Sequence, residues 1–448
     1  MSEQTLIQNA RLVNEDRITD GDLLIRKGRI ETIAPSITAR GDVEVIDAGG
    51  RYLLPGMIDD QVHFREPGLT HKGGIRSESR AAAAGGITSF MEMPNTLPPT
   101  VTLAALEDKY GVAAEKSLVN YAFYLGATND NLDVIRALQP GQAAGIKIFM
   151  GASTGNMLVD NEETLAGIFR DAPALIATHC ESSPMIDANL AAALEKYGPE
   201  IPVTEHPNIR SAEACYASTE LALGLARRFD APLHVLHLST AREMELFEPG
   251  PMNGKLVTAE ICVHFLHFDS RDYATHGNRI KCNPAIKTPA DRAGLLRALK
   301  EGRLDIIATD HAPHTAEEKA ATDYRKAPSG LPLVQDALLS VLELHHDGDL
   351  SLEQIVRLTA HNVADRFRVI DRGYLREGYW ADLVLVDTSA PTVASAERVL
   401  SQCGWTPFEG ETFRSSIART IVNGRTVFDG RGIIEADAAQ RLEIGAQR

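Results

Sequence analysis

The sequence predicts a (β/α)8 TIM barrel together with a small β-sandwich domain that both ends of the chain build. Three observations support this fold class. The first and last parts of the chain alternate apolar and polar residues in short runs bounded by turn signals. The middle alternates short apolar runs with helical patterns, as a parallel α/β fold does. The length of 448 residues suits a large barrel plus an accessory domain.

The β-rich ends are the first element of the prediction. Near the N-terminus the alternating runs are 5–13, 22–26, 29–33 and 43–47. The same pattern returns at 381–386, 418–422 and 425–428, where Asn423-Gly424 is a hairpin signal. We expect residues 1–54 and 370–448 to form one sandwich, and residues 55–369 to form the barrel. Two separate small sheets are the alternative that the pattern leaves open.

The barrel strands come next. Their near-continuous apolar character is typical of strands that are buried on both faces of a parallel sheet. The predicted strands are 57–64, 89–94, 121–126, 145–151, 174–180, 232–239, 255–262 and 305–310. Helices are predicted between them, including 77–84, which ends at Gly85-Gly86, and 211–229. Ser351 and Gln354 form a capping-box pattern that opens a helix to about Phe367.

Composition narrows the class of protein. The formal net charge of −16 disfavours a general nucleic-acid surface, although it leaves room for a local cationic pocket. The 5 cysteines are scattered without a C-x-x-C pair, which favours reduced thiols. The N-terminal residues have no apolar core of a signal peptide, and no apolar run approaches the length of a membrane span. We therefore expect a cytoplasmic protein.

Polar side chains lie where the predicted strands end, which in a barrel is the position of the active site. Taken singly, each has an ordinary explanation: a histidine in an apolar strand is usually a hydrogen-bonded core residue, and a lysine is usually paired. Together they form a converging cluster that is electrostatically unreasonable without a cation or a substrate. The residues are Gln61, His63, Arg65, Asn95, Lys147, His179, His237, Asp310 and His314.

These residue types indicate a metal site. Imidazole and carboxylate groups suit Zn²⁺. The ammonium group of Lys147 cannot ligate a metal, but its free amine can react with CO₂ to give a carbamate with two oxygens. Such a carbamate could bridge two metals, which would explain a buried lysine that is otherwise costly.

The assembled motifs resemble those of the amidohydrolase superfamily and, within it, dihydroorotases of the long, class I-like type. REPG followed by MPNT points to dihydroorotase more than to its relatives. The matching segments are IDDQVHFREPG (58–68), MPNT (93–96), GIKIFMG (145–151), HCE (179–181), HLS (237–239), NPAI (283–286) and TDHAPH (309–314).

The resemblance implies a role for each matching residue. His63 and Asp310 would bind one zinc ion, His179 and His237 a second, and carboxylated Lys147 would bridge both. The carboxylate on the substrate ring would be held by Arg65, Asn95 and His314, and Asn283 would contact the ring. The implied reaction is the zinc-dependent, reversible cyclisation of N-carbamoyl-L-aspartate to L-dihydroorotate in pyrimidine synthesis. In hydrolysis, Asp310 would take the proton of the attacking water and pass it to the ring nitrogen that leaves.

Two features depart from the family pattern. Gln61 stands where the family usually has the first histidine of His-x-His. The first metal could therefore be weakly held, absent, or bound through the Gln61 oxygen. The polar segment 315–332 after the last barrel strand is either a lid over the mouth or a solvated surface loop.

Other functions remain open from the sequence. An allantoinase or hydantoinase would keep the metal residues but would not need Arg65, Asn95 and His314 as a carboxylate site. A catalytically silent scaffold is the alternative of another class, and Gln61 is the feature that favours it. A homodimer is expected from base rates for soluble enzymes, and a contact with aspartate transcarbamoylase is a further candidate interaction.

Overall fold

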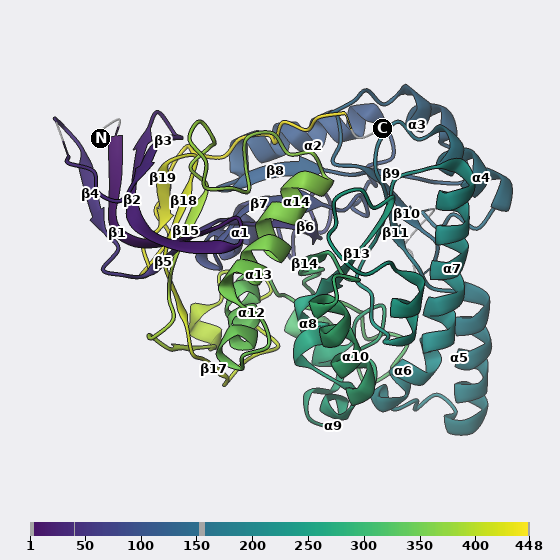
Figure 1. The fold of residues 1–448 in the computed structure, drawn as a ribbon. Helices are drawn as coiled ribbons and strands as arrows, with labels where there is room; N and C mark the ends of the chain where they lie inside the picture. Colours follow the sequence, from purple (N-terminus) through teal and green to yellow (C-terminus); the bar gives the residue numbers. More distant parts are fainter. Residues whose placement is uncertain (1–3, 40, 152–156, 447–448) are drawn as a thin grey trace.

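The middle of the chain forms the predicted barrel in a computed structural model that describes residues 4–39, 41–151 and 157–446 (Figure 1). Neighbouring barrel strands pair in parallel and follow one another in sequence order. Each apolar run predicted above contains a strand. The strands are β6 (Met57–Val62), β7 (Ile87–Glu92), β8 (Asn120–Phe123), β9 (Leu125–Gly126), β10 (Ile146–Phe149), β11 (Ile176–His179), β12 (Leu233–Val235), β13 (Val257–Cys262) and β14 (Ile306–Ala308).

The barrel closes where β14 meets β6. Val62 forms a parallel bridge with His311, and the His63 N–H donates to the His311 carbonyl at 2.7 Å. Every residue of β6 and β7 is buried, as expected for strands covered on both faces. Closure therefore brings the end of the first barrel strand beside the end of the last, although nearly 250 residues separate them.

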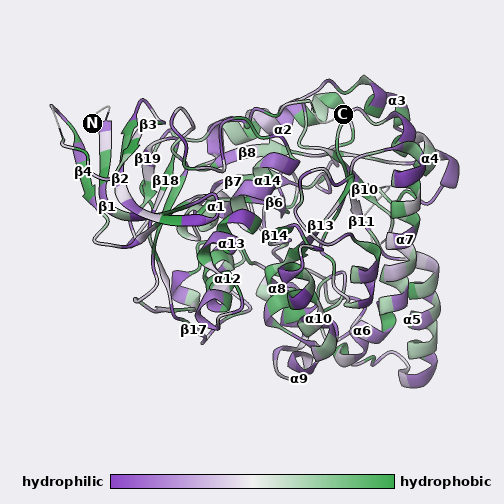
Figure 2. Ribbon diagram, viewed as in Figure 1, coloured by the Kyte–Doolittle hydropathy of each residue, from purple (hydrophilic) through white to green (hydrophobic). Residues whose placement is uncertain are grey.

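Helices surround the strands (Figure 1). In Figure 2 strands β10 and β11 are mostly hydrophobic, whereas α5 mixes hydrophobic and hydrophilic residues, as an outer helix does. The helices are α1 (Ile75–Ala84), α2 (Leu103–Lys116), α3 (Leu132–Ala137), α4 (Glu162–Asp171), α5 (Ser183–Tyr197), α6 (His206–Ile209), α7 (Ala212–Phe229), α8 (Val263–His267), α9 (Tyr273–His276), α10 (Pro289–Lys300), α11 (Ala316–Lys319), α12 (Ala337–His346), α13 (Leu352–Val356) and α14 (Asn362–Arg366).

The predicted helix boundaries rest on the expected capping interactions. The Ser211 side chain accepts from the backbone of Ala214 and begins α7, and Gly85 caps α1. Ser351 and Gln354 form the reciprocal capping box that opens α13. A π-helical segment, Arg357–His361, joins α13 to α14, so the predicted helix is present with an irregular middle.

The two ends of the chain share one sheet, which excludes two separate small sheets. Its order is β19-β18-β15-β5-β1-β2-β3, with β4 paired to β1. Leu383 of β15 pairs with Pro55 of β5, next to the start of the barrel. The strands are β1 (Gln4–Asn14), β2 (Arg17–Arg26), β3 (Arg29–Ala34), β4 (Glu44–Asp47), β5 (Tyr52–Pro55), β15 (Leu383–Asp387), β18 (Ser416–Val422) and β19 (Arg425–Phe428); β16 (Thr392–Val393) and β17 (Thr412–Phe413) pair separately.

This β-rich domain has its own hydrophobic core. Leu23 and Ile30 from the N-terminal part pack with Leu383 and Ile421 from the C-terminal part. The last described residues leave the domain and run along α2 to the barrel (Figure 1), where Arg441 pairs with Glu107 at 2.9 Å. The exact division into 1–54 with 370–448 and 55–369 stays a prediction. No helix within the described residues has the length and apolarity needed to cross a membrane.

Candidate active site

The ten residues singled out for the site all line one cavity of about 440 Å³ at the carboxyl ends of the barrel strands. A cavity of this size suits a small-molecule substrate. The residues are Gln61, His63, Arg65, Asn95, Lys147, His179, His237, Asn283, Asp310 and His314. The strand-end reasoning therefore selected side chains that the fold does bring together.

His63 and Asp310 form the first donor pair. His63 Nδ1 lies 2.7 Å from Asn95 Oδ1, which can only accept, so Nδ1 carries the proton. Burial lowers the pKa of His63 despite the adjacent carboxylate, so the ring is neutral and Nε2 presents a lone pair. That lone pair faces Asp310 Oδ1 at 3.0 Å. Two electron-pair donors this close need a cation or a shared proton between them.

His179 and His237 form the second pair. His179 Nε2 lies 2.9 Å from Glu181 Oε2. Burial would raise the pKa of Glu181, but Arg210 and His179 lower it to about 2, so Glu181 is an ionised acceptor. Nδ1 of His179 is therefore the nitrogen with the lone pair, because burial also lowers the pKa of this imidazole. It faces His237 Nε2 at 2.9 Å.

Lys147 lies on β10 near both pairs and is 1% exposed. Burial lowers its pKa to about 8, so the free amine is readily populated. Its Nζ lies 4.7 Å from the centre of the Phe149 ring. This amine has the chemistry that carbamate formation requires.

Gln61 faces Asp310 through its amide. Its Nε2 donates to Asp310 Oδ1 at 3.1 Å, and its Oε1 lies 3.7 Å from Cys262 Sγ. In this orientation the amide holds the Asp310 carboxylate in place, and its oxygen is turned toward β13. Gln61 thus belongs to the site, with a hydrogen-bonding contact where the family pattern has an imidazole.

Three site residues adopt a left-handed backbone conformation that is uncommon for residues other than glycine. The φ angles are 69° at Arg65, 41° at His237 and 51° at Asp310. Such conformations persist only where the surrounding structure enforces them, and they concentrate at functional sites. The three residues follow the ends of their strands, and their side chains line the cavity.

Arg65, a cation, and His314 form one wall of the cavity. Lys72 Nζ lies 3.1 Å from His314 Nδ1 and can only donate, so Nδ1 is the acceptor. Nε2 then carries the proton and donates to the Ser329 carbonyl at 3.1 Å. Burial, followed by Arg65 and Lys72, holds the pKa of His314 far below its usual range. Arg65 Nε donates to the Pro313 carbonyl at 3.2 Å, whereas Arg65 Nη2 is 3.1 Å from a nitrogen that is itself a donor, so the Nη groups remain available.

Asn283 and the segment after β14 complete the cavity. Asn283 Oδ1 is buried and has no hydrogen-bond partner among the described residues, so it can accept from a ligand N–H. Tyr324, Pro328 and Gly330 line the cavity, so residues 315–332 are more than a solvated surface loop. Lys319 stabilises this segment by donating to the carbonyls of Lys281, Pro328 and Gly330.

Several residues of the site were missed from sequence. Glu181 orients His179, Lys72 sets the tautomer of His314, and Arg210 lines the cavity while pairing with Glu181. Only Glu181 had a sequence signal, since it follows His179 by two residues in HCE. His311, next to Asp310, bonds to Glu78 and to the backbone of Leu333 and does not line the cavity.

The donor set fits divalent metal ions. In the first pair, a neutral His63 nitrogen faces the Asp310 carboxylate, and the other ring nitrogen of His63 is held by Asn95. In the second pair, His179 faces His237, and the other ring nitrogen of His179 is held by Glu181. Oriented imidazole with an outer hydrogen-bond acceptor is the usual arrangement at zinc sites. The residues that could hold such ions are His63, Asp310, His179 and His237. Lys147 lies between the strands that carry the first pair and those that carry the second.

Comparisons with known proteins agree with this geometry. The model of the Amidohydrolase family matches residues 52–427. The chain is 35% identical over 431 residues to a dihydroorotase of Halobacterium salinarum, covering 94% of this chain and 97% of the relative. It is 31% identical over 437 residues to an allantoinase of Bacillus velezensis, covering 96% and 95%. An L-hydantoinase (dihydropyrimidinase) structure from Arthrobacter aurescens has a TM-score of 0.93 at 28% identity, covering 98% of this chain and 99% of that one.

Proposed function

The chain belongs to the amidohydrolase family, and on this premise we propose that it is a dihydroorotase, which opens L-dihydroorotate to N-carbamoyl-L-aspartate and closes the ring in reverse. The coarser activity, a metal-dependent cyclic amide hydrolase, follows from the family and its hydrolase relatives. The scaffold interpretation is therefore set aside. The choice among cyclic amides rests on the wall of the cavity that carries Arg65.

One observation carries the choice of substrate. Arg65 is 7% exposed, lines the cavity, and has no carboxylate within ion-pair distance among the described residues. Burial lowers its pKa to about 10, so the guanidinium is still charged at neutral pH. A buried cation without an anionic partner is costly unless a ligand supplies one. A carboxylate on the substrate ring meets this need through a bidentate contact.

The neighbouring residues fit a cyclic amide that carries such a carboxylate. Asn95 uses its Oδ1 to hold His63, which leaves its N–H groups for the substrate. The unpartnered Oδ1 of Asn283 can accept the ring N–H. Arg65, Asn95 and Asn283 would thus orient the ring so that one carbonyl faces the metal-binding pairs.

Metal ions would be held by His63 with Asp310 and by His179 with His237, and we propose Zn²⁺ bridged by carboxylated Lys147. When bound, such ions activate water as a nucleophile and polarise the amide carbonyl. Asp310 is positioned to move the proton. Burial would raise its pKa, but a proton shared with His63, followed by His237 and His264, lowers it below the usual range, so it is an ionised base at neutral pH. It would accept the proton of the attacking water and deliver it to the leaving ring nitrogen.

A second candidate is an allantoinase or hydantoinase, and the allantoinase and L-hydantoinase relatives favour it. Hydantoin and allantoin have no ring carboxylate to pair with Arg65. Turnover of L-dihydroorotate, allantoin and hydantoin by the zinc-loaded full chain separates the candidates. We expect kcat/KM for L-dihydroorotate to be higher by about 10- to 100-fold, the value of a charged hydrogen bond. A preference for allantoin or hydantoin would overturn the dihydroorotase assignment while leaving the cyclic amidase in place.

The role of Arg65 can be tested directly by Arg65→Met. We expect KM for L-dihydroorotate to rise by about 10- to 100-fold, because the carboxylate loses its cationic partner, with metal content unchanged. Arg325→Met is the matched control, since Arg325 also lines the cavity but is exposed and paired with Asp323. Equal KM values for wild type and Arg65→Met would remove Arg65 from the substrate site.

The proposal also keeps the expectations drawn from sequence on location and partners. These are a cytoplasmic protein that forms a homodimer, with a contact to aspartate transcarbamoylase as a candidate interaction. Each stays a prediction.

A further inference from the structure

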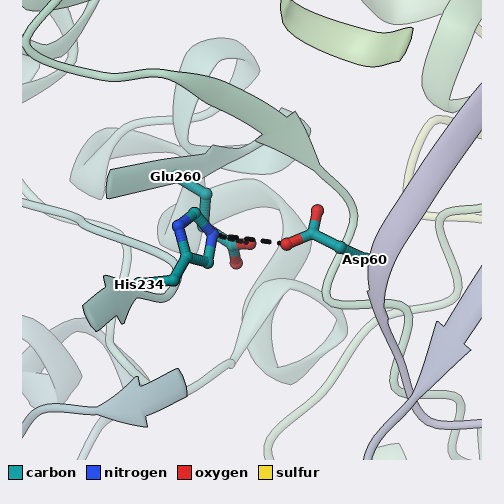
Figure 3. Close-up of side chains that lie close together, drawn as sticks. All are labelled: Asp60, His234 and Glu260. Atoms are coloured by element: carbon teal, nitrogen blue, oxygen red, sulfur yellow. Dashed lines mark hydrogen bonds and ion pairs between the residues drawn. The ribbon is translucent and has the colours of Figure 1, made fainter. Parts of the chain in front are cut away.

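A second cluster of metal-type ligands lies inside the barrel, separate from the side chains of the mouth. Asp60 of β6, His234 of β12 and Glu260 of β13 point toward one another (Figure 3), and each is 0% exposed. Their nearest ligand atoms all lie within 4.8 Å of one another. None of the three lines the cavity of the mouth. Two carboxyl groups and one imidazole therefore meet in a part of the core that water does not reach.

One tautomer of His234 directs a lone pair at the two carboxyl groups. Its Nδ1 lies 2.8 Å from Thr258 Oγ1, and that hydroxyl lies 3.5 Å from the Leu233 carbonyl. The hydroxyl proton can be given to the carbonyl, so the oxygen accepts from Nδ1–H. Nε2 is then the ring nitrogen that faces Asp60 and Glu260. A second ring nitrogen fixed by an outer partner is a recurring feature of metal-bound histidine.

The distances are within the range of ligands that share one metal ion. Nε2 lies 3.3 Å from Asp60 Oδ2 and 3.2 Å from Glu260 Oε2. The shorter contact is also within hydrogen-bond distance. A tetrahedral zinc ion with bonds of about 2.0–2.2 Å separates its ligands by about 3.3–3.6 Å. The two separations from Nε2 lie at the short end of this range or just below it.

Asp60 supplies the independent evidence for a ligand. Both of its side-chain oxygens are buried and lack a hydrogen-bond partner among the described residues. Asp59, the preceding residue on the same strand, is a contrast: it accepts from Thr309 Oγ1 at 2.6 Å and from the backbone of Gln61 and Thr309. His234 Nε2 lies at ion-pair distance, 3.3 Å, but a core carboxylate that accepts no hydrogen bond still costs several kcal/mol, which a bound cation would remove.

We propose that Asp60, His234 and Glu260 form a structural site for a divalent transition-metal ion, of which Zn²⁺ fits the donor set best. The ion would join β6, β12 and β13 across the barrel interior. It would also stabilise the mouth indirectly, because Glu260 Oε1 accepts the backbone N–H of His237 at 3.0 Å. That bond supports the left-handed conformation of His237, whose φ is 41°.

Anomalous diffraction from crystals of the full chain, grown from protein expressed with added zinc, tests the site without any variant. Data are collected above and below the absorption edge of each metal that mass spectrometry finds in the protein. We expect a peak bonded to His234 Nε2, Asp60 and Glu260, resolved from any peak between His63, Asp310, His179 and His237. No peak among Asp60, His234 and Glu260 would overturn the inference, whatever occupies the mouth.

Metal counting in solution gives the second test. Asp60→Asn should lower the metal content by one ion per chain, whereas Asp59→Asn, equally buried but fully hydrogen-bonded, should leave it unchanged. Equal metal content in folded wild type and Asp60→Asn would overturn the inference. If Asp60→Asn does not fold, the diffraction result on wild type decides. Because the readouts are positions and counts of ions, they are independent of which cyclic amide the enzyme hydrolyses.

Discussion

The barrel mouth and the junction between the barrel and the β-rich domain both bury charged groups, but only the junction gives each charged group a partner within the protein. At the junction, Arg372 pairs with Asp382 and donates to Asn423 Oδ1 at 2.7 Å. Asn120 of β8 donates to Asp382 at 3.0 Å and accepts from Asn423 at 2.6 Å. Every member of this network has a partner on another element. The network joins the barrel to the returning C-terminal strands.

At the mouth the polar groups oppose one another instead. The lone pair of His63 faces a carboxylate, His179 faces His237, and no carboxylate of the described residues lies within ion-pair distance of Arg65. A buried polar network in which every group has a hydrogen-bond or ion-pair partner stabilises a fold, whereas buried polar groups without such partners indicate that a ligand binds there. Variants at the mouth should therefore abolish activity and spare the fold, and variants at the junction should do the reverse.

The largest effect is expected for Lys147→Ala. Without the amine the ions lose their proposed bridge, and activity should fall by at least about 10⁴-fold, equivalent to about 5.5 kcal/mol. The thermal midpoint should change little, because a costly buried amine is removed. Steady-state rates, metal content by mass spectrometry and thermal unfolding measure these quantities.

A short carboxylic acid provides the control for Lys147→Ala. It should restore part of the activity and of the metal content by supplying the missing oxygens, and a primary amine of the same size should not. Full activity of Lys147→Ala without added acid would end the carbamate hypothesis and weaken the contrast between the two regions.

Arg372→Met should have the next largest effect, and on stability. It leaves the Asp382 carboxylate buried without its cation, which costs about 3–5 kcal/mol of unfolding free energy. Urea unfolding measures the loss, and kcat of the protein that remains folded should match wild type. Arg419→Met is the control, since Arg419 in the same domain makes one partly buried bond, to Thr426. Lost turnover at wild-type stability in Arg372→Met would contradict the contrast.

The sequence predicted which side chains share the cavity, because the ends of the strands in a closed barrel meet at one mouth. Once strands were recognised, closure placed Arg65, Lys147, His237 and Asp310 at one mouth. Strand lengths were predicted less well. The run 232–239 contains a strand only at Leu233–Val235, because His237 takes a positive φ that ends the extended backbone. An apolar pattern carries no signal for that turn.

Side-chain orientations and tautomers in the site depend on contacts between residues that lie far apart in the sequence. The orientation of the Gln61 amide depends on Cys262 and Asp310, and the tautomer of His314 depends on Lys72. No local pattern specifies such pairs. The π-helical segment Arg357–His361 is similar: the repeat predicted one regular helix, but His361 is drawn toward Asn14 of β1. Tertiary contacts therefore decided what the sequence pattern left undetermined.

His361 gives the smallest predicted effect and refines the comparison, because it is a buried titrating group where the barrel meets β1. It stacks on Tyr374 with 4.1 Å between ring centres and lies 3.1 Å from Asn14 Oδ1. Burial lowers its pKa to about 4 from the ordinary value of 6.5. Between pH 6.5 and about 4, His361 therefore binds a proton in the unfolded chain but not in the folded chain. Its contribution to stability is complete above pH 6.5 and is lost as the pH falls through about 4.

Wild type should consequently lose up to about 3 kcal/mol more stability than His361→Phe between pH 7 and pH 4. The phenyl ring keeps the stacking on Tyr374 and does not titrate, and His361→Gln, which keeps a donor for Asn14, should give the same flattened profile. Buried histidines of the mouth titrate in all three proteins, so the difference between the unfolding curves isolates His361. Parallel curves of unfolding free energy against pH for wild type and both variants would mean that His361 does not change its protonation on unfolding in this range. The acid sensitivity would then come from the mouth alone.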